Sequence, residues 1–224
     1  MTETRRRLIN FIQSLPKAEH HLHIEGSCPW ERMHAVDPER YDEPPASWGS
    51  EFRFGSFHEF EQMIFRYVGP WMTGPERYAE AAALILEKRQ SENVRYAEIS
   101  FAGIVAEMTG IDLAELAAAV KSAVPSGLPI KLFCGLHHQG FEKGQDAYLS
   151  QILDSPDIDG IDLHGPEEFP LRPWLKEYWP AARAAGKTTK AHAGEMTGAS
   201  SVREVVEDLG VTKVQHGIRA VEDP

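Results

Sequence analysis

Short apolar runs alternate with longer helical patterns along most of this sequence, and this alternation restricts the fold more than any other feature. Repeats of this kind are typical of βα units around a parallel sheet. Six runs are predicted to be strands: Ala18 to Ile24, Arg95 to Phe101, Ile130 to Leu136, Gly160 to His164, Thr188 to Ala193 and Lys213 to His216. Helical spacing of apolar residues predicts helices at Phe57 to Val68, Pro75 to Glu92, Ile111 to Val124 and Ser200 to Leu209.

The number of strands predicts an α/β barrel that is incomplete in this chain. A TIM-type (β/α)8 barrel has about 250 residues and eight strands, whereas this chain has 224 residues. We therefore expect a single, incomplete barrel domain over residues 1–224, with roughly six of the eight strands. The stretch 37–55 has prolines at 38, 44 and 45 and no clear period, which predicts a long excursion after the first strand.

The net charge and the two cysteines restrict the possible binding partners and the cellular compartment of the protein. Asp and Glu number 34 against 23 Lys and Arg, and the net charge of −11 would repel nucleic acid and anionic membranes. No run approaches the roughly 18 apolar residues of a membrane span. The two cysteines, Cys28 and Cys134, are far apart and fit a reducing compartment. We therefore expect a cytoplasmic protein that binds neither nucleic acid nor membrane.

Histidines stand at the ends of three predicted strands. His21 and His23 close the first strand, and period-two geometry sends both imidazoles to one face, where they can bind one zinc ion. His192 closes the fifth strand, with Glu195 three residues later, and His216 closes the sixth. Each histidine alone is compatible with an ordinary strand end. Because the carboxyl ends of barrel strands open onto one face, the five side chains should converge, which predicts a metal-dependent hydrolase.

At these residues the sequence resembles the adenosine deaminase family. The resemblance rests on the segments PKAEHHLHIEGS (16–27), NVRYAE (93–98), DLHG (162–165), HAGE (192–195) and HG (216–217). The first and fourth are specific in combination, and together the five cover essentially the whole chain. The resemblance implies an eight-stranded barrel that hydrolyses the amino group of a 6-aminopurine, such as adenosine or adenine, to a carbonyl group and ammonia.

The resemblance also implies the chemistry of the site. His21, His23 and His192 would bind one zinc ion per chain. Glu195 would donate a proton to the purine ring, and His216 would orient and deprotonate the attacking water. These roles agree with general chemistry, since zinc can lower the pKa of bound water to about 7 and positioned acid/base groups contribute about 10²–10⁴-fold.

Substrate contacts are expected from His23, Glu25 and the backbone N–H of Gly165, with a purine base or nucleoside as the partner. Phe60 and Ile64 match an apolar flap over the family's pocket, although a core-facing stripe is the commoner meaning of that spacing. Glu25 stands where adenosine deaminases usually carry Asp. The Glu form is more typical of adenine deaminases and of enzymes that act on modified adenosines, so the purine stays open.

Three other positions depart from the family. His20 replaces an apolar residue, and Gln215 stands where the family usually has Gly. The family's fourth ligand, an Asp on the last strand, has no counterpart here, and Asp162 lies on a different strand. We expect that the chain is a fragment of a longer product and is inactive alone. Strands from a partner chain, or a truncated zinc-binding pseudoenzyme, are the alternatives, and the oligomeric state stays open.

Other functional classes give different expectations. Another amidohydrolase with a two-metal centre would also use the HxH pair, but it would need a bridging carboxylated Lys or a Glu on a middle strand. Glu98 and Lys131 lie on middle strands without a clear bridging position. The two isolated cysteines exclude the zinc deaminases that edit nucleic acids through a P-C-x-x-C motif. A binding or scaffold protein is the non-enzyme alternative.

Overall fold

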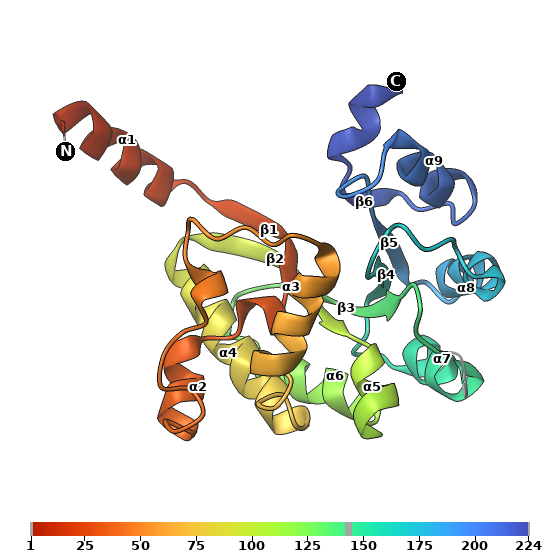
Figure 1. The fold of residues 1–224 in the computed structure, drawn as a ribbon, viewed down its shortest axis with the longest axis horizontal. Helices are drawn as coiled ribbons and strands as arrows, with labels where there is room; N and C mark the ends of the chain where they lie inside the picture. The colour runs from red at the N-terminus through yellow and green to blue at the C-terminus, as the bar shows by residue number, and fades with distance from the viewer. Residues whose placement is uncertain (1, 142–144, 224) are drawn as a thin grey trace.

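The computed structural model describes residues 2–141 and 145–223, and it contains a parallel sheet of six strands (Figure 1). The strands are β1 (Lys17–His23), β2 (Val94–Ala102), β3 (Ile130–His137), β4 (Gly160–His164), β5 (Thr188–Ala193) and β6 (Lys213–His216). They pair in chain order, and each neighbouring pair is parallel. The six predicted strands are confirmed, and each end lies within one residue of its predicted position.

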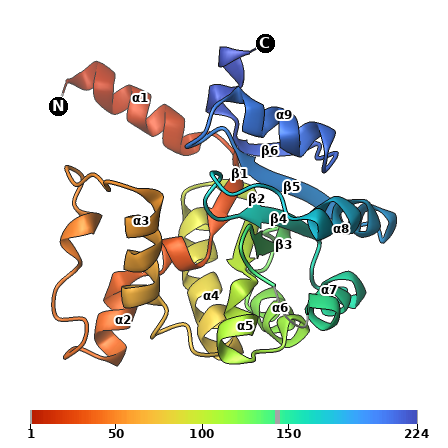
Figure 2. The same cartoon turned by 45° about the vertical axis from the view of Figure 1, so that its right-hand side comes forward.

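Apart from the helix that precedes the first strand, the helices occupy the connections between the strands, and the longer ones among them cover the outside of the sheet (Figures 1 and 2). They are α1 (Glu3–Ser14), α2 (Trp30–Val36), α3 (Phe57–Met63), α4 (Pro75–Ser91), α5 (Ile104–Thr109), α6 (Leu113–Ser122), α7 (Gln145–Asp154), α8 (Pro173–Ala184) and α9 (Ala199–Glu207). A turn of π-helix, η3 (Ile64–Val68), continues α3. Short 3₁₀ turns are η1 (Glu25–Ser27), η2 (Ala46–Trp48) and η4 (Ile218–Glu222).

Capping residues explain where two of these helices begin. Asp112 precedes α6, and its side chain accepts a hydrogen bond from the backbone N–H of Glu115 at 2.9 Å. The α4 helix begins with Pro75 in its first turn, where a missing N–H leaves no hydrogen bond unmade. Four residues of α6 are buried against the sheet or its neighbours: Leu113, Leu116, Ala117 and Val120.

The two faces of the sheet differ in chemistry. The outer face is apolar and forms the core with the helices, for example through Ile99, Phe101, Leu132 and Leu163. The buried polar and charged residues of the strands include Glu98, Ser100, Asp162, His164, Lys190 and His192. Side chains alternate between the faces of a strand, so the inside of the barrel carries the polar groups.

The sheet curls far enough for its two ends to contact each other across the inside. Side chains of Lys190 on β5 and Gln215 on β6 both donate hydrogen bonds to the backbone oxygen of His20 on β1. The strands therefore form most of an α/β barrel. Helix α1 extends away from it (Figures 1 and 2), and none of its residues is buried. Of the regular elements, residues 37–55 contain only η2.

Candidate active site

Three imidazole rings meet inside the barrel at the carboxyl ends of two strands. His21 and His23 belong to β1 and His192 to β5. Their Nε2 atoms form a triangle, with 3.0 Å between His21 and His23, 2.9 Å between His21 and His192, and 3.1 Å between His23 and His192. The structure thus brings together three side chains that the sequence singled out as metal ligands.

Burial and the neighbouring charges set the protonation of these rings. Burial lowers the pKa of His21 to about 4, helped by the nearby His192 and His216, and it lowers the pKa of His23 well below the usual value. Burial also disfavours the charged form of His192, but the carboxylate of Asp162 outweighs it and raises the pKa of His192. His21 and His23 are therefore neutral at pH 7, the form in which histidine binds a metal.

Asp162, a buried residue of β4, orients His192. Its Oδ1 atom lies 3.1 Å from His192 Nδ1. Burial opposes ionisation of this carboxyl group, but His192 and His164 together outweigh that effect and hold the pKa of Asp162 well below its usual range. A carboxylate on one ring nitrogen turns the other nitrogen toward a metal. The donor set fits zinc, which in catalytic sites binds three protein ligands, with nitrogen at about 2.0–2.1 Å.

A fourth buried imidazole, His164, adjoins the cluster, and sequence reasoning assigned it no role. Its ring centroid lies 4.6 Å from that of His23 and 4.8 Å from that of His192. Gly135 leaves room for this ring, since a Cβ atom at position 135 would lie 2.0 Å from His164 Nδ1. Ring nitrogens of His23, His164 and His192 lie within 4.8 Å of one another, as do those of His21, His192 and His216, so either of these sets could also hold a metal ion.

Glu195 and His216 lie beside the cluster and contact each other. Glu195 Oε2 is 3.1 Å from His216 Nε2, and the His216 ring centroid is 4.7 Å from that of His21. Burial lowers the pKa of His216 and so favours its neutral form, which accepts a proton. Gly194 permits the turn before Glu195, with φ of +71° and a Cβ that would lie 2.6 Å from Val202. The pair can exchange protons with a ligand in the site.

Glu167 holds the loop that carries Glu195, and sequence reasoning missed it. Its carboxylate accepts backbone hydrogen bonds from Gly194 at 3.0 Å, Glu195 at 2.9 Å and Thr197 at 3.2 Å, and one from the Thr197 hydroxyl at 2.6 Å. Burial opposes ionisation of Glu167, but these donors outweigh it and lower its pKa. The sequence indicates only that the N–H groups of a tight loop need a hydrogen-bond acceptor. It does not indicate which residue provides that acceptor.

A cavity of about 430 Å³ opens from the histidine cluster, within the ~300–1,000 Å³ of typical small-molecule sites. Its lining includes the site residues His21, His23, His164, His192, Glu195 and His216. Apolar side chains from α3, η3 and α5 line another part of it, among them Phe57, Phe60, Ile64, Phe65, Val105 and Met108. The two positions matched to an apolar flap, Phe60 and Ile64, therefore border the cavity.

Gly165 and Glu25 also line this cavity. Gly165 has φ of +93°, and a Cβ there would lie 2.5 Å from His137 Nε2, so a side chain would be strained and would clash. The Glu25 carboxylate is anchored, since its Oε1 accepts hydrogen bonds from the Tyr78 hydroxyl and the Ala102 N–H, both at 2.8 Å. Burial raises the pKa of Glu25 despite these contacts.

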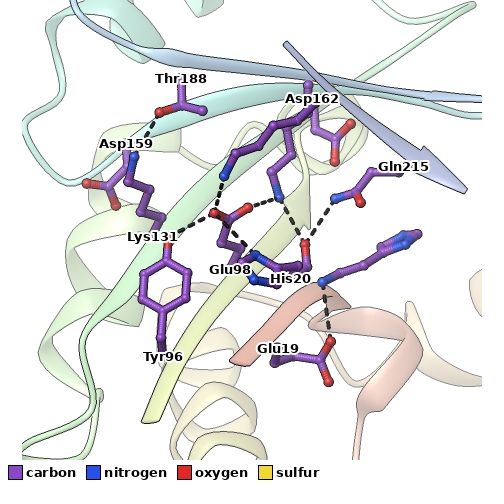
Figure 3. Close-up of polar contacts among 12 residues, drawn as sticks. Glu19, His20, Tyr96, Glu98, Lys131, Asp159, Asp162, Thr188 and Gln215 are labelled. Carbon is purple, nitrogen blue, oxygen red and sulfur yellow. Dashed lines mark hydrogen bonds and ion pairs between the residues drawn. The ribbon is translucent and has the colours of Figure 1, made fainter. Parts of the chain in front are cut away.

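The two middle-strand residues considered for a bridging role make other contacts. Glu98 is paired with Lys190 at 2.5 Å and with Lys213. Lys131 Nζ donates to the Thr188 hydroxyl at 3.0 Å. Figure 3 shows both side chains in this polar network. These contacts favour a structural role for both residues over metal bridging.

A family model described as adenosine deaminase matches residues 16–224. An adenine deaminase of Vibrio parahaemolyticus is 31% identical over 224 residues, which cover 95% of this chain and 66% of the relative. The chain therefore spans about two thirds of the length of the relatives it matches. No helix of the described residues is long and apolar enough to cross a membrane.

Solved structures agree with this match. The adenine deaminase of Arthrobacter aurescens superimposes with a TM-score of 0.76 at 26% identity, over 93% of this chain and 66% of that one. An amidohydrolase of Burkholderia ambifaria, solved with bound zinc, shares the fold with a TM-score of 0.81 at 23% identity, over 100% and 64%. An Arabidopsis protein solved with GMP shares it with a TM-score of 0.68 at 18% identity, over 93% and 66%.

Proposed function

This chain belongs to the adenosine deaminase family, and on that premise we propose that it carries most of the active site of a zinc-dependent enzyme that hydrolytically deaminates a 6-aminopurine. One observation carries the proposal. Three histidine Nε2 atoms lie 2.9 to 3.1 Å apart, beside the Glu195–His216 contact of 3.1 Å. Both groups border one cavity, so a metal, a proton donor and a proton acceptor would act on the same ligand.

His21, His23 and His192 would hold the zinc ion, one per chain. Zinc there would supply a Lewis acid that makes water a nucleophile near pH 7. His216 would accept the proton of the attacking water, and burial keeps this ring in the neutral form that can do so. Glu195 would donate a proton to the ring nitrogen beside the attacked carbon, and Glu167 would hold it in place through the backbone of its loop.

The rest of the cavity would position the purine. The Gly165 N–H would bind a ring nitrogen, which needs a close approach of the base to the main chain, and glycine permits that approach. His23 and Glu25 would contact the substrate nearby. Phe60 and Ile64 would cover the apolar faces of the base and exclude water. A neutral base or nucleoside fits this lining. The deamination assay described below distinguishes adenine, adenosine and a modified purine as substrates.

The family's fourth metal ligand, an Asp, has no counterpart in the 224 residues. We therefore propose that the barrel deaminates its substrate only when that carboxylate is present, and that these residues alone do not. The match to about two thirds of each relative is the observation that motivates this distinction.

Deamination of adenine and adenosine, followed by ultraviolet absorption with zinc supplied, tests the proposal. It compares this chain with a longer product in which the chain is extended by the family segment that carries the Asp ligand. Turnover by the longer product, lost in its Glu195→Gln variant, supports the proposal. No turnover of adenine, adenosine or N6-methylated analogues by a zinc-loaded longer product contradicts it and favours a zinc-binding protein without activity.

A further inference from the structure

The backbone oxygen of His20 is held by two side chains that reach across the inside of the barrel. Lys190 Nζ on β5 donates to it at 3.1 Å. Gln215 Nε2 on β6 donates to it at 3.2 Å, a contact that can be followed in Figure 3. His20 directly precedes His21, Lys190 lies two residues before His192, and Gln215 directly precedes His216. The three strands with residues of the proposed site are therefore connected through one oxygen atom.

The backbone at this point has lost its regular sheet pairing. Glu19 pairs with Ala97 and Leu22 with Ile99, so β1 has one more residue than β2 between these pairs, as in a β-bulge. The His21 N–H instead donates to Glu19 Oε1 at 3.3 Å. Both polar groups of the His20–His21 peptide are thus bound by side chains.

A second set of contacts holds Lys190 in place. Its side chain is only 3% exposed, and its Nζ lies 2.5 Å from Glu98 Oε2 and 4.0 Å from the centre of the Phe133 ring. Glu98 is 1% exposed and also accepts from the Tyr96 hydroxyl at 2.8 Å and from Lys213. A buried ammonium needs such pairing, and the pairing directs one of its protons to the His20 oxygen.

We propose that Lys190 and Gln215 are positioning residues for the metal centre. By fixing the His20–His21 peptide they set where the His21 imidazole lies relative to His192 and His216. A hydrogen bond from an ammonium group is stronger than one between neutral groups, and two donors on one oxygen leave the peptide little freedom to rotate. This inference rests on the proposed function, since it takes His21 to be a metal ligand.

Zinc affinity, measured by competition with a chromophoric chelator, and the visible spectrum of the Co²⁺-loaded chain test this inference. Gln215→Met keeps the length of the side chain and removes its donors. Its control is Gln13→Met, on the exposed helix α1. Lys190→Met has its control in Lys131→Met, because Lys131 binds Thr188 instead of His20. Circular dichroism checks that each variant is folded.

We expect Gln215→Met and Lys190→Met to weaken zinc binding by about 10-fold or more, the size of effect found for residues that orient metal ligands. Both should shift the Co²⁺ bands, while the two controls leave affinity and spectrum unchanged. Gln215→Gly, which introduces the residue usual in the family, provides a second variant if the methionine is not tolerated, and the same loss is expected.

A His21→Ala arm separates the two proposals. If His21→Ala abolishes tight zinc binding while folded Gln215→Met and Gln215→Gly bind zinc within twofold of the parent with an unchanged Co²⁺ spectrum, the positioning role is wrong and the metal site stands. If His21→Ala also leaves zinc binding unchanged, the proposed metal site itself is wrong, and the positioning role falls with it.

Discussion

Asp162 Oδ1 lies 3.1 Å from His192 Nδ1, a contact between neighbouring strands that is buried on both sides. It fixes which nitrogen of His192 faces His21 and His23. We predict that Asp162→Ala lowers zinc affinity by about 10- to 100-fold, as loss of such a carboxylate does in other histidine sites. Chelator competition measures this, with Asp208→Asn, a partner of exposed Lys176, as the control. Unchanged affinity in a folded Asp162→Ala variant would contradict the role.

Glu167 accepts hydrogen bonds from three backbone N–H groups of the loop after β5, those of Gly194, Glu195 and Thr197. We predict that Glu167→Gln lowers the kcat of the proposed deaminase by about 10- to 100-fold, because small misplacements of a reacting group cost up to about 10²-fold. Zinc affinity should stay within twofold, since the variant leaves the histidines in place. The adjacent, exposed Glu168 offers a matched control in Glu168→Gln. Equal loss of kcat in both variants would argue against the positioning role of Glu167.

Strands were predictable from this sequence because each combines a short apolar run with sharp boundaries. The β4 strand, buried along its whole length, was placed to the residue. Helix α8 was not singled out, and it has prolines at its start and in its interior, at Pro173 and Pro180, which are usual signs of a helix boundary. The π-turn η3 has no local sequence sign, so the helical spacing from Phe57 to Val68 gave one helix where the structure has α3 followed by η3.

Only the site residues at or just after the carboxyl ends of strands were predictable from the sequence. His21, His23, His192, Glu195 and His216 meet because barrel topology brings the carboxyl ends of strands together. The supporting contacts depend on tertiary placement instead. Asp162 lies 30 residues from His192, and Gln215 lies 195 residues from His20, so no spacing rule connects them.

Gly165 combines a positive φ of +93° with close packing, because a Cβ would lie 2.5 Å from His137 Nε2. Gly127 has a similar φ of +80° and open space around it. We predict that Gly165→Ala destabilises the chain by more than Gly127→Ala, which should cost about 1 kcal/mol from backbone strain alone. Urea unfolding measures the difference. Equal costs would mean that His137 moves aside.

Glu98 makes the folding stability of the metal-free chain depend on pH in the acidic range. Burial raises its pKa, but Lys190, Lys213 and Tyr96 outweigh burial and lower the pKa from 4.5 to about 2. The unfolded chain therefore binds a proton at Glu98 at higher pH than the folded chain. The stabilisation is fully present above about pH 4.5 and is lost as the pH falls through about 2.

We accordingly predict a flatter decline of unfolding free energy between about pH 5 and pH 2 for Glu98→Gln than for the parent chain, because the amide cannot titrate. Urea unfolding at several pH values measures both curves. Glu31→Gln, at an exposed position, should leave the curve of the parent chain unchanged. Since the Glu98→Gln substitution would remove the ion-pair partner of buried Lys190, the variant should also be less stable at pH 7. Parallel curves for Glu98→Gln and the parent would show that other carboxyl groups control the acid transition.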